Sequence, residues 1–241
     1  SGVPVIVLAP KDVVDCYTLT IQAFNYAEEF RCPVFIASNK EIGMTKTSID
    51  LDAIPVPDLV DRTPHQGDHF IPFQAEPEKA PPFLPIGGKT LVRQTSSTHG
   101  PDGYITIDPD LITENQERLR NKILSAESRI ALYEDTHRDG ADTLVISYGV
   151  TTKAVDDACE RLEKQGRPVS SLNLKTLWPV PKTLIKKQAA PYKRIVVPEM
   201  NLGQYIGEIK KALPDKEIVF YGQMNGVLIT PERLMEVINK E

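Results

Sequence analysis

Short runs of apolar residues alternate along the chain with segments in which apolar residues recur at helical spacing. Val3–Ala9 and Pro33–Ala37 are continuous apolar runs of strand length, a pattern typical of strands covered on both faces. Between them, from Val13 to Phe30, apolar residues recur every three or four positions, and Asp12 stands where a helix cap is expected. This order predicts two parallel strands joined by one right-handed helical crossover.

Two strands and one helix leave most of a hydrophobic core open, so this unit is too small to be a complete domain. We therefore expect it to be the end of a larger sheet whose earlier part precedes Ser1.

The second half of the chain repeats the alternation more regularly. A long polar helix is predicted from Asp110 to about Glu134, with Pro109 and Asp110 as its start signals. Further strands are expected at 144–147, 169–174, 194–197 and 217–221, and further helices at 151–165, 181–189, 203–213 and 231–239. Such alternation predicts an α/β fold with a mostly parallel sheet and helices on both faces.

Proline separates the two halves. Eight of the 20 prolines lie between Pro55 and Pro85, in a stretch without helical period. Long irregular segments within compact chains are typically linkers or binding loops. We therefore divide the chain into a first domain part at 1–50, a Pro-rich interdomain connection at 51–109, and a second domain at 110–241.

Composition excludes several classes of function. The net charge of −5, with 25% charged and 41% hydrophobic residues, gives no electrostatic reason to expect nucleic acid as a partner. No apolar run approaches the roughly 20 residues of a transmembrane helix, so no membrane association is expected. Cys16, Cys32 and Cys159 form no C-x-x-C pair, which favours buried free thiols, no thiolate metal site and a cytoplasmic location.

Two other patterns, one phosphate-binding and one metal-binding, do not hold. The stretch GGKT at 87–90 resembles the end of a phosphate-binding P-loop, but Phe83 stands where that loop requires glycine. His65 and His69 have the spacing of two zinc ligands on a helix, yet the prolines around them argue against a helix. We therefore predict no metal ligands on this chain.

Ligands and partners of parallel sheets meet the carboxyl ends of the strands. Thr151 and Thr152 follow one predicted strand at a helix N-terminus, where they indicate either a plain cap or an anion site. Trp178, in the same turn as Lys175, indicates either a rigid apolar corner or an interface anchor.

A third turn follows the predicted strand at 194–197. It carries Glu199, Asn201 and Gln204 around one glycine. Three hydrogen-bonding side chains at this point indicate a structural hydrogen-bond network or a docking surface, rather than a catalytic site.

These motifs together resemble a known family. Ser147–Ala154 (SYGVTTKA), Leu172–Pro181 (LNLKTLWPVP) and Val197–Gln204 (VPEMNLGQ) resemble the alpha subunit of 2-oxoacid:ferredoxin oxidoreductases, of the 2-oxoglutarate or branched-chain 2-oxoacid type. Tyr17–Glu28 and Asn225–Leu234 are also similar to that family. The resemblance implies that the chain begins in the end of a thiamine-enzyme pyrimidine domain and continues into a transketolase-C-terminal-like domain.

The resemblance implies a function larger than this chain. Enzymes of the family decarboxylate a 2-oxoacid on thiamine diphosphate, pass electrons through iron–sulfur clusters to ferredoxin, and form an acyl-CoA. In them the beta subunit holds the diphosphate and magnesium, and a ferredoxin-like element carries further clusters. The implied partners are therefore the beta subunit, the ferredoxin-like subunit, the missing N-terminal half of the alpha subunit, and ferredoxin and coenzyme A at the level of the complex.

The sequence departs from the family in one respect. The glutamate that activates the aminopyrimidine lies in the family's N-terminal half, which would precede Ser1, and Glu28, Glu29 and Glu41 do not match its motif. We therefore assign no catalytic residue to this chain and expect it to be structural, to dock with other subunits and to be inactive alone. The turn at Pro10, Lys11 and Asp12 is the part expected to approach a cofactor site across an interface.

Two alternatives stay open at this stage. The chain could be a non-catalytic regulatory module that binds a small anion near Thr151 and Thr152. It could also belong to another thiamine enzyme of transketolase type, such as a sugar transferase, although the motif from Glu199 to Gln204 fits those enzymes less well.

Overall fold

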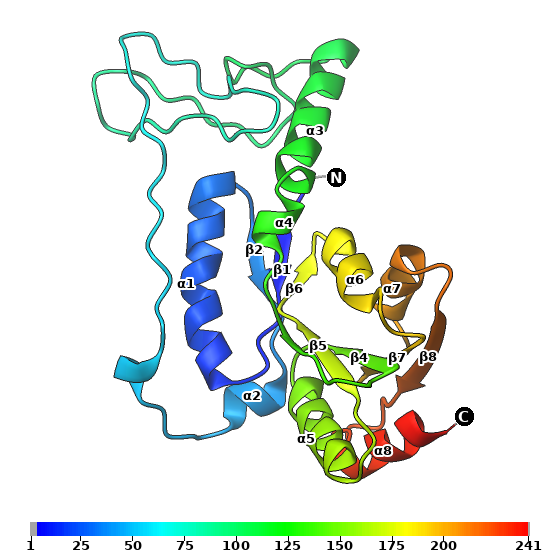
Figure 1. Cartoon of the computed structure of the whole chain (residues 1–241). Coiled ribbons are helices and arrows are strands. Elements are labelled where there is room, and N and C mark those ends of the chain that lie inside the picture. Colours follow the sequence, from blue (N-terminus) through cyan, green and yellow to red (C-terminus); the bar gives the residue numbers. More distant parts are fainter. Residues whose placement is uncertain (1–3, 241) are drawn as a thin grey trace.

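Two β-sheets and a long irregular segment make up the chain (Figure 1). The computed structural model describes residues 4–240, so Val3, expected in the first strand, lies outside the described residues. Strand β1 (Ile6–Leu8), helix α1 (Val13–Phe30) and strand β2 (Val34–Ile36) form the predicted crossover, with β1 and β2 parallel. The side chain of Asp12 caps α1, as its position in the sequence predicts.

The second sheet has five strands in the order β3-β5-β4-β7-β8. It contains β3 (Tyr133–Thr136), β4 (Thr143–Ser147), β5 (Ser170–Leu174), β7 (Arg194–Glu199) and β8 (Glu217–Gly222). All neighbours are parallel except β3, which runs antiparallel to β5 at the edge. The predicted α/β fold with a mostly parallel sheet is confirmed.

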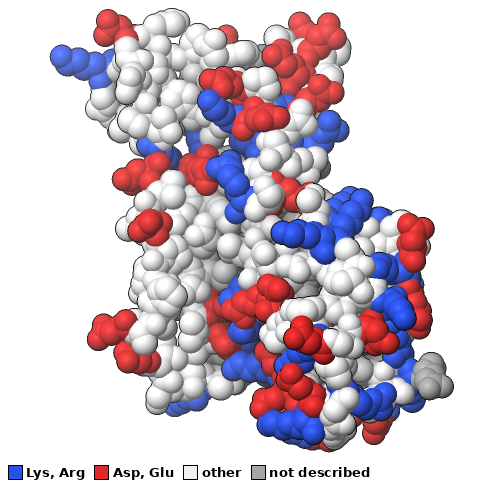
Figure 2. Space-filling view, in the orientation of Figure 1, with Lys and Arg blue, Asp and Glu red and all other residues white. Residues whose placement is uncertain are grey.

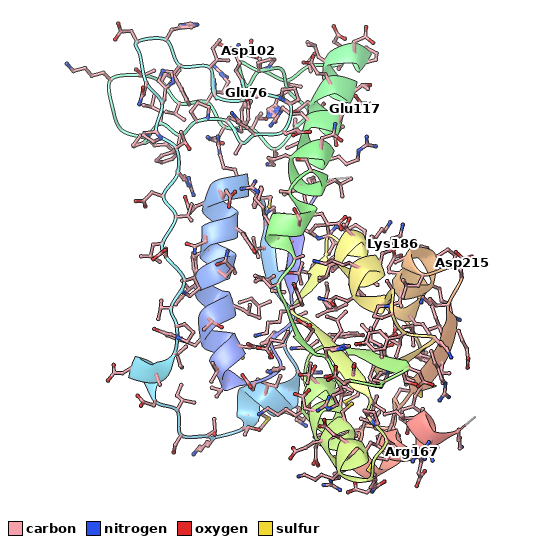
Figure 3. The ribbon with its side chains drawn as sticks, in the orientation of Figure 1. Glu76, Asp102, Glu117, Arg167, Lys186 and Asp215 are labelled. Carbon is pink, nitrogen blue, oxygen red and sulfur yellow. The ribbon has the colours of Figure 1, made fainter. Side chains whose placement is uncertain are left out.

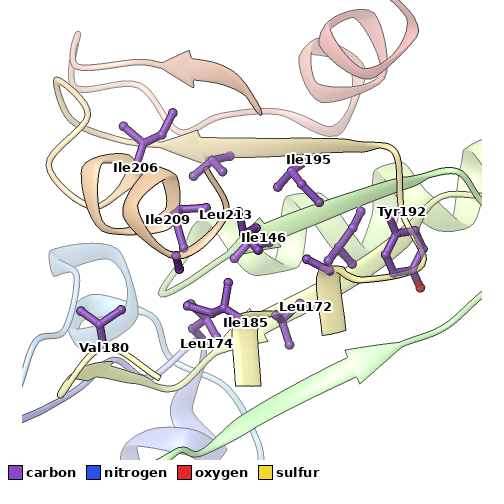
Figure 4. Packing of buried hydrophobic residues seen from close by; sticks show 14 residues of the cluster. Ile146, Leu172, Leu174, Val180, Ile185, Tyr192, Ile195, Ile206, Ile209 and Leu213 are labelled. Atoms are coloured by element: carbon purple, nitrogen blue, oxygen red, sulfur yellow. The ribbon is translucent and has the colours of Figure 1, made fainter. Parts of the chain in front are cut away.

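Helices cover both faces of this sheet. Residues of α6 (Lys182–Ala189) and α7 (Ile206–Ala212) pack in one buried cluster, and those of α5 (Thr151–Lys164) and α8 (Pro231–Asn239) pack in another. The strands supply both clusters alternately: Leu144 and Ile146 belong to the first and Val145 to the second. Figure 4 shows the first cluster, with Ile146 and Ile195 facing Ile209.

The long helix predicted from Asp110 to about Glu134 is wrong at its C-terminal end. Helix α3 (Pro109–Leu124) stops, a single turn α4 (Glu127–Ile130) follows, and β3 begins at Tyr133. All four residues of β3 are exposed, so neither a helical nor a strand period marks them in the sequence. This segment is an edge strand because it pairs with β5. The pairing, a tertiary contact, determines its structure in place of the local sequence pattern.

Three further short elements escape sequence-based prediction. Strand β6 (Thr176–Trp178) pairs antiparallel with β1 and completes the first sheet in the order β2-β1-β6. Helix α2 (Lys40–Met44) and the 3-10 turn Leu51–Ala53 follow β2. Because β6 follows β5 after a single residue, one continuous segment contributes to both sheets.

The buried residues of α3 and α4 belong to the core of the first sheet. Ile123, Ala126 and Ile130 pack in one cluster with Ile6 of β1 and Tyr26 of α1. This packing favours assigning these helices to the first unit, whereas the domain division at residue 110 stays a prediction from sequence.

The Pro-rich connection has little regular structure, as predicted. Figure 1 shows it running alongside α1 and then looping beyond the end of α1, beside α3. In it His65 stacks edge-on against Phe70. Among residues 4–240 no cluster of three or more His, Cys, Asp or Glu side chains could hold a metal ion, and no helix is long and apolar enough to cross a membrane. Of the three free cysteines only Cys159 is buried, whereas Cys16 and Cys32, also expected to be buried, are half-buried.

A buried lysine joins α3 to α1. Lys122 is 2% exposed, and its ammonium donates a hydrogen bond to the carbonyl oxygen of Phe30 at the end of α1. Burial lowers the pKa of Lys122 from 10.5 to about 8, which the nearby Cys32 thiol partly opposes. Between those two values the unfolded chain binds more protons than the folded chain, so the free energy of unfolding rises with pH in this window.

Replacing Lys122→Met should abolish this contribution. Between pH 7 and pH 10.5 the free energy of unfolding of wild type should rise by about 3 kcal/mol more than that of the variant. One pKa unit corresponds to about 1.4 kcal/mol. Urea unfolding at a series of pH values measures this difference. Lys210→Met, which changes an exposed lysine of α7, is the matched control and should parallel wild type. Parallel curves for Lys122→Met and wild type would contradict the assignment.

Candidate functional site at the junction of the two sheets

Lys175 lies at the point where the chain passes from one sheet to the other. Its carbonyl oxygen accepts a hydrogen bond from the amide of Ala9 (2.7 Å), and its own amide donates to the carbonyl of Leu132 (2.9 Å). Its ammonium contacts Asp15 Oδ1 at 2.6 Å and Glu134 Oε1 at 2.5 Å. A single residue therefore joins β5, β6, the start of α1 and the edge strand β3.

A second lysine completes this charge network. Lys11 pairs with the other carboxylate oxygen of Glu134, and the amide of Lys11 donates to Asp15 Oδ2 (3.1 Å). Burial alone would lower the pKa of Lys11 and of Lys175, but the carboxylates of Glu134 and Asp15 raise both above their ordinary values. Burial alone would raise the pKa of Glu134, and its two lysine partners hold it below its ordinary value.

The turn at Pro10, Lys11 and Asp12 is thus engaged within the chain. Pro10 is buried, Lys11 pairs with Glu134, and Asp12 Oδ1 accepts the amide of Asp15 (2.9 Å) to cap α1. These contacts give each polar side chain of the turn a structural partner. The approach of this turn to a cofactor across an interface stays a prediction.

Thr151 and Thr152 begin α5, but they face different surroundings. Thr152 is 1% exposed, and its hydroxyl donates to Asn173 Oδ1 (2.9 Å) and lies 3.2 Å from Ser147 Oγ. Thr152 therefore belongs to a buried polar chain of strand residues. Thr151, also buried, has no such contact to Asn173 or Ser147.

Asn39, a residue that the sequence analysis did not single out, caps α5 from the first unit. Its Oδ1 accepts the amide of Val150 (3.2 Å). Gly149 lies in the left-handed region (φ 60°), and a Cβ atom there would stand 2.8 Å from Asn39 Oδ1. The glycine at this turn was the only sequence signal of so close an approach, and it does not identify the partner.

Glu199 and Asn201 form a hydrogen-bond network at the start of α7. The carboxylate of Glu199, 1% exposed, accepts the hydroxyl of Tyr148 (2.9 Å) and the amides of Tyr205 (3.0 Å) and Ile206 (2.7 Å). Asn201 donates to the Tyr148 hydroxyl (3.0 Å). The carboxylate thus satisfies free amides at a helix start, where negative charge is favoured.

Gln204 and Trp178 lie at the surface near this network. The amide of Gln204 donates to Asn201 Oδ1 (3.1 Å), while its side chain is exposed. Tyr205 Oη donates to the carbonyl of Leu177 (3.1 Å), which connects α7 to β6. Trp178 on β6 is 45% exposed, at an outer edge of the first sheet. Its role as an interface anchor stays a prediction.

Two of the glutamates considered in the sequence, Glu28 and Glu29, are engaged in ion pairs within the chain. Glu28 pairs with Arg62 and Glu29 with Arg129, so neither carboxylate is free to activate an aminopyrimidine. Both side chains lie near the C-terminal end of α1, away from the carboxyl ends of β1 and β2.

Charge is distributed unevenly over the surface. Figure 2 shows few charged side chains over α1 and the extended segment beside it, whereas acidic and basic side chains are interspersed around the second sheet. In Figure 3, Glu76, Asp102 and Glu117 lie at the end of the molecule formed by the connection and α3, and Arg167, Lys186 and Asp215 lie at the periphery of the second sheet.

Comparison with known proteins accounts for both halves of the chain. The family model described as "Pyruvate flavodoxin/ferredoxin oxidoreductase, thiamine diP-bdg" matches residues 2–118, and the model "Pyruvate:ferredoxin oxidoreductase core domain II" matches residues 141–234. Together the two models cover most of the chain, and both describe parts of pyruvate flavodoxin/ferredoxin oxidoreductases. The first match extends into α3, in agreement with the packing of that helix.

The relatives make the assignment more specific. The chain is 32% identical over 237 residues to "2-oxoglutarate synthase subunit KorA" of Methanocaldococcus jannaschii, which covers 97% of this chain. It is 24% identical to "Ketoisovalerate oxidoreductase subunit VorB" of Methanothermobacter thermautotrophicus, over 97% of its length. The chain belongs to the family of 2-oxoacid:ferredoxin oxidoreductase alpha subunits. It spans 63% of the length of the first of these relatives and 59% of the second.

Solved structures agree on the fold. The 2-oxoglutarate:ferredoxin oxidoreductase from Magnetococcus marinus superimposes with a TM-score of 0.83 at 24% identity, over 98% of this chain and 42% of that chain. A split-gene transketolase has a TM-score of 0.50 at 14% identity, over 98% of this chain and 56% of that chain. The predicted combination of a thiamine-enzyme domain end and a transketolase-like domain is confirmed as a fold.

Replacing Lys175→Met tests the junction. Asp15, whose side chain is 4% exposed, would lose its cation, and we expect a loss of about 3 kcal/mol in the free energy of unfolding, as for other broken buried pairs. Glu134→Gln is the matched control, since that side chain is 47% exposed and should cost less than about 1 kcal/mol. Urea unfolding of both variants measures the contrast.

The double variant Lys175→Met with Asp15→Asn separates charge from packing. Because the uncompensated carboxylate is then absent, it should recover part of the stability lost in Lys175→Met. A loss of less than about 1 kcal/mol for Lys175→Met would show that Lys175 does not hold the junction.

Proposed function

We propose that this chain is the C-terminal part of the alpha subunit of a thiamine diphosphate-dependent 2-oxoacid:ferredoxin oxidoreductase. The enzyme would oxidatively decarboxylate a 2-oxoacid to an acyl-CoA and CO2 and reduce ferredoxin. The observation that carries the proposal is the adjacent match of two parts of one enzyme family to the two halves of the chain. Family membership favours this function over a free-standing regulatory module or a sugar transferase.

The role of this chain within the enzyme would be structural. On the first sheet, Ile6 and Leu8 of β1 are buried against α1, whereas Val7 points to the opposite face. Val7 is paired with Phe35 of β2, which is 55% exposed. Parallel strands are normally covered on both faces, so this face lacks a layer. We infer that the upstream part of the alpha subunit supplies it.

Cofactors and partners follow from this role. Thiamine diphosphate would be held between this subunit and the beta subunit. The activating glutamate would lie in the upstream part, since Glu28 and Glu29 near the end of α1 are engaged in ion pairs. Iron–sulfur clusters would lie on partner chains, among them a ferredoxin-like subunit. Magnesium at the diphosphate, coenzyme A as acyl acceptor and a cytoplasmic location stay predictions.

The relatives favour 2-oxoglutarate as the first substrate to test. The relative bearing that substrate in its name is 32% identical to this chain, whereas those named for ketoisovalerate are 24% and 23% identical. Both substrates belong in the assay, because residues that select a 2-oxoacid need not lie in this part of the subunit.

Reconstitution tests the proposal. The chain would be expressed with the upstream alpha-subunit segment and the beta subunit, and the CoA-dependent reduction of ferredoxin by 2-oxoglutarate would be measured. We expect activity in the assembly and none with the chain alone. Phe35→Asp should prevent copurification of the upstream segment, because it places a charge on the uncovered face. The control is Met224→Asp, a residue 54% exposed in the loop after β8.

Two results would contradict the proposal: an assembly that forms normally with Phe35→Asp, or a complete assembly that reduces ferredoxin with neither 2-oxoacid. The first outcome would remove the structural role inferred for the uncovered face, and the second the proposed reaction.

A further inference from the structure

A short antiparallel pairing lies in the Pro-rich connection, just before α3 begins. Residues 98–100 pair with residues 104–106, and His99 lies opposite Ile105. The two hydrogen bonds of the pairing run from the amide of Gly100 to the carbonyl of Tyr104 (3.0 Å) and from the amide of Thr106 to the carbonyl of Thr98 (3.1 Å). Figure 1 shows the connection and the start of α3 at the end of the molecule away from the second sheet.

The outer edge of this pairing is open. In an antiparallel pair the backbone groups of successive residues point alternately toward and away from the partner strand. Those of Tyr104 and Thr106 point toward residues 98–100, so those of Ile105 and, further along, of Ile107 point to the outer edge. Among residues 4–240 the backbone groups of these two isoleucines form no hydrogen bond.

Both isoleucines are also exposed on one face of this edge. Side chains two residues apart on a strand share a face, and Ile105 and Ile107 are 68% and 92% exposed. An apolar edge with unpaired backbone groups is a place where another strand can be added. The edge is therefore suited to bind an extended segment of another polypeptide.

The segment is complementary to a second copy of itself. Two copies paired antiparallel about a two-fold axis at Thr106 place Ile105 of each copy opposite Ile107 of the other. These are the residues whose backbone groups point outward, so each opposed pair exchanges both of its hydrogen bonds. The isoleucine side chains of the two copies then pack together on one face. Two-fold contacts between identical surfaces are the commonest in homo-oligomers.

Charge on the opposite face favours the same register. Tyr104, Thr106 and Asp108 alternate with the isoleucines and so share that face. Arg93 stacks on Tyr104, with its Cζ atom 3.7 Å from the ring centroid, and forms no ion pair among residues 4–240. The register places Asp108 of the second copy opposite Tyr104, beside this guanidinium. Asp108 caps α3 through Oδ1 only, so Oδ2 can accept from Arg93.

We propose that segment 104–108 pairs with the same segment of a second copy of this chain, within the complex that contains it. The pairing combines backbone hydrogen bonds, an apolar cluster of two isoleucines from each copy, and an ion pair between Arg93 of each copy and Asp108 of the other. It joins the two copies through their Pro-rich connections. The proposal goes beyond the 2-oxoacid oxidoreductase reaction and does not depend on it.

A disulfide at the two-fold axis tests the proposal. In this register Thr106 faces Thr106 of the second copy as a non-hydrogen-bonded pair, with Cα atoms about 4.5 Å apart, which a disulfide can span. Thr106→Cys in the complete complex should therefore cross-link two copies of this chain under mild oxidation, as seen on a non-reducing gel. Ser96→Cys, at an exposed position of the same connection, is the matched control and should give at least about tenfold less cross-linked product.

Ile107→Lys, introduced together with Thr106→Cys, tests the apolar face. Lysines then stand where isoleucines would pack, so cross-linking should be at least about tenfold slower. Leu91→Lys, at a residue 81% exposed in the same connection, is the control and should leave the rate unchanged. Arg93→Glu, which brings carboxylates together across the pairing, should slow cross-linking about threefold.

Four results would overturn the proposal. These are no cross-link between copies of this chain with Thr106→Cys, an equal yield with Ser96→Cys, a rate that Ile107→Lys leaves unchanged, or a cross-link from Thr106→Cys to a different subunit. The last result would identify another occupant of the edge. Reduction of ferredoxin, measured on the same preparation, reports separately on the proposed function.

Discussion

The arrangement of the whole chain depends on one crossing point, where the segment from β5 to β6 leaves one sheet and enters the other. Lys175 occupies that point, and its ammonium lies 2.6 Å from Asp15 and 2.5 Å from Glu134. Taking these charges out of water is costly unless each has a partner. The network therefore fixes the start of α1 against the edge strand of the second sheet, and the two units form one continuous structure.

This constraint explains how polar groups are used within the chain. Asn39 of the first unit caps α5 of the second, and Glu199 satisfies the amides at the start of α7. Both residues hold backbone groups that would otherwise be buried without a partner. The described acidic and amide side chains at the strand ends thus serve mainly to position helices. The face of the first sheet that carries Val7 and Phe35 is the one that we propose another polypeptide covers.

The sequence predicted the repeating elements well and the connections between units poorly. Runs such as Leu144–Ser147 are recognisable as strands in the sequence, because strands buried on both faces are apolar throughout. Strand β3, with four exposed residues, and the short β6 carry no such signal, since their positions come from pairing with β5 and β1. The small number of strands in the first unit was predicted, and the structure adds only β6 to it.

The candidate site was predictable as a set of residue types and not as a set of contacts. The sequence placed Glu199 and Asn201 in a hydrogen-bonding turn, and the structure adds Tyr148, which arrives from the end of β4. Lys175 was singled out only as part of a turn, because its partners Asp15 and Glu134 lie 160 and 41 residues away along the chain. Long-range pairs of this kind leave no local pattern.

Native mass spectrometry of the complex isolated from its source, combined with thiamine and iron determination on the same sample, tests the central claim most directly. We expect this chain in one assembly with a polypeptide that supplies the upstream part of the alpha subunit, whether continuous with it or separate, and with a subunit that carries thiamine diphosphate and iron. A monomer of this chain alone, free of both cofactors, would contradict it.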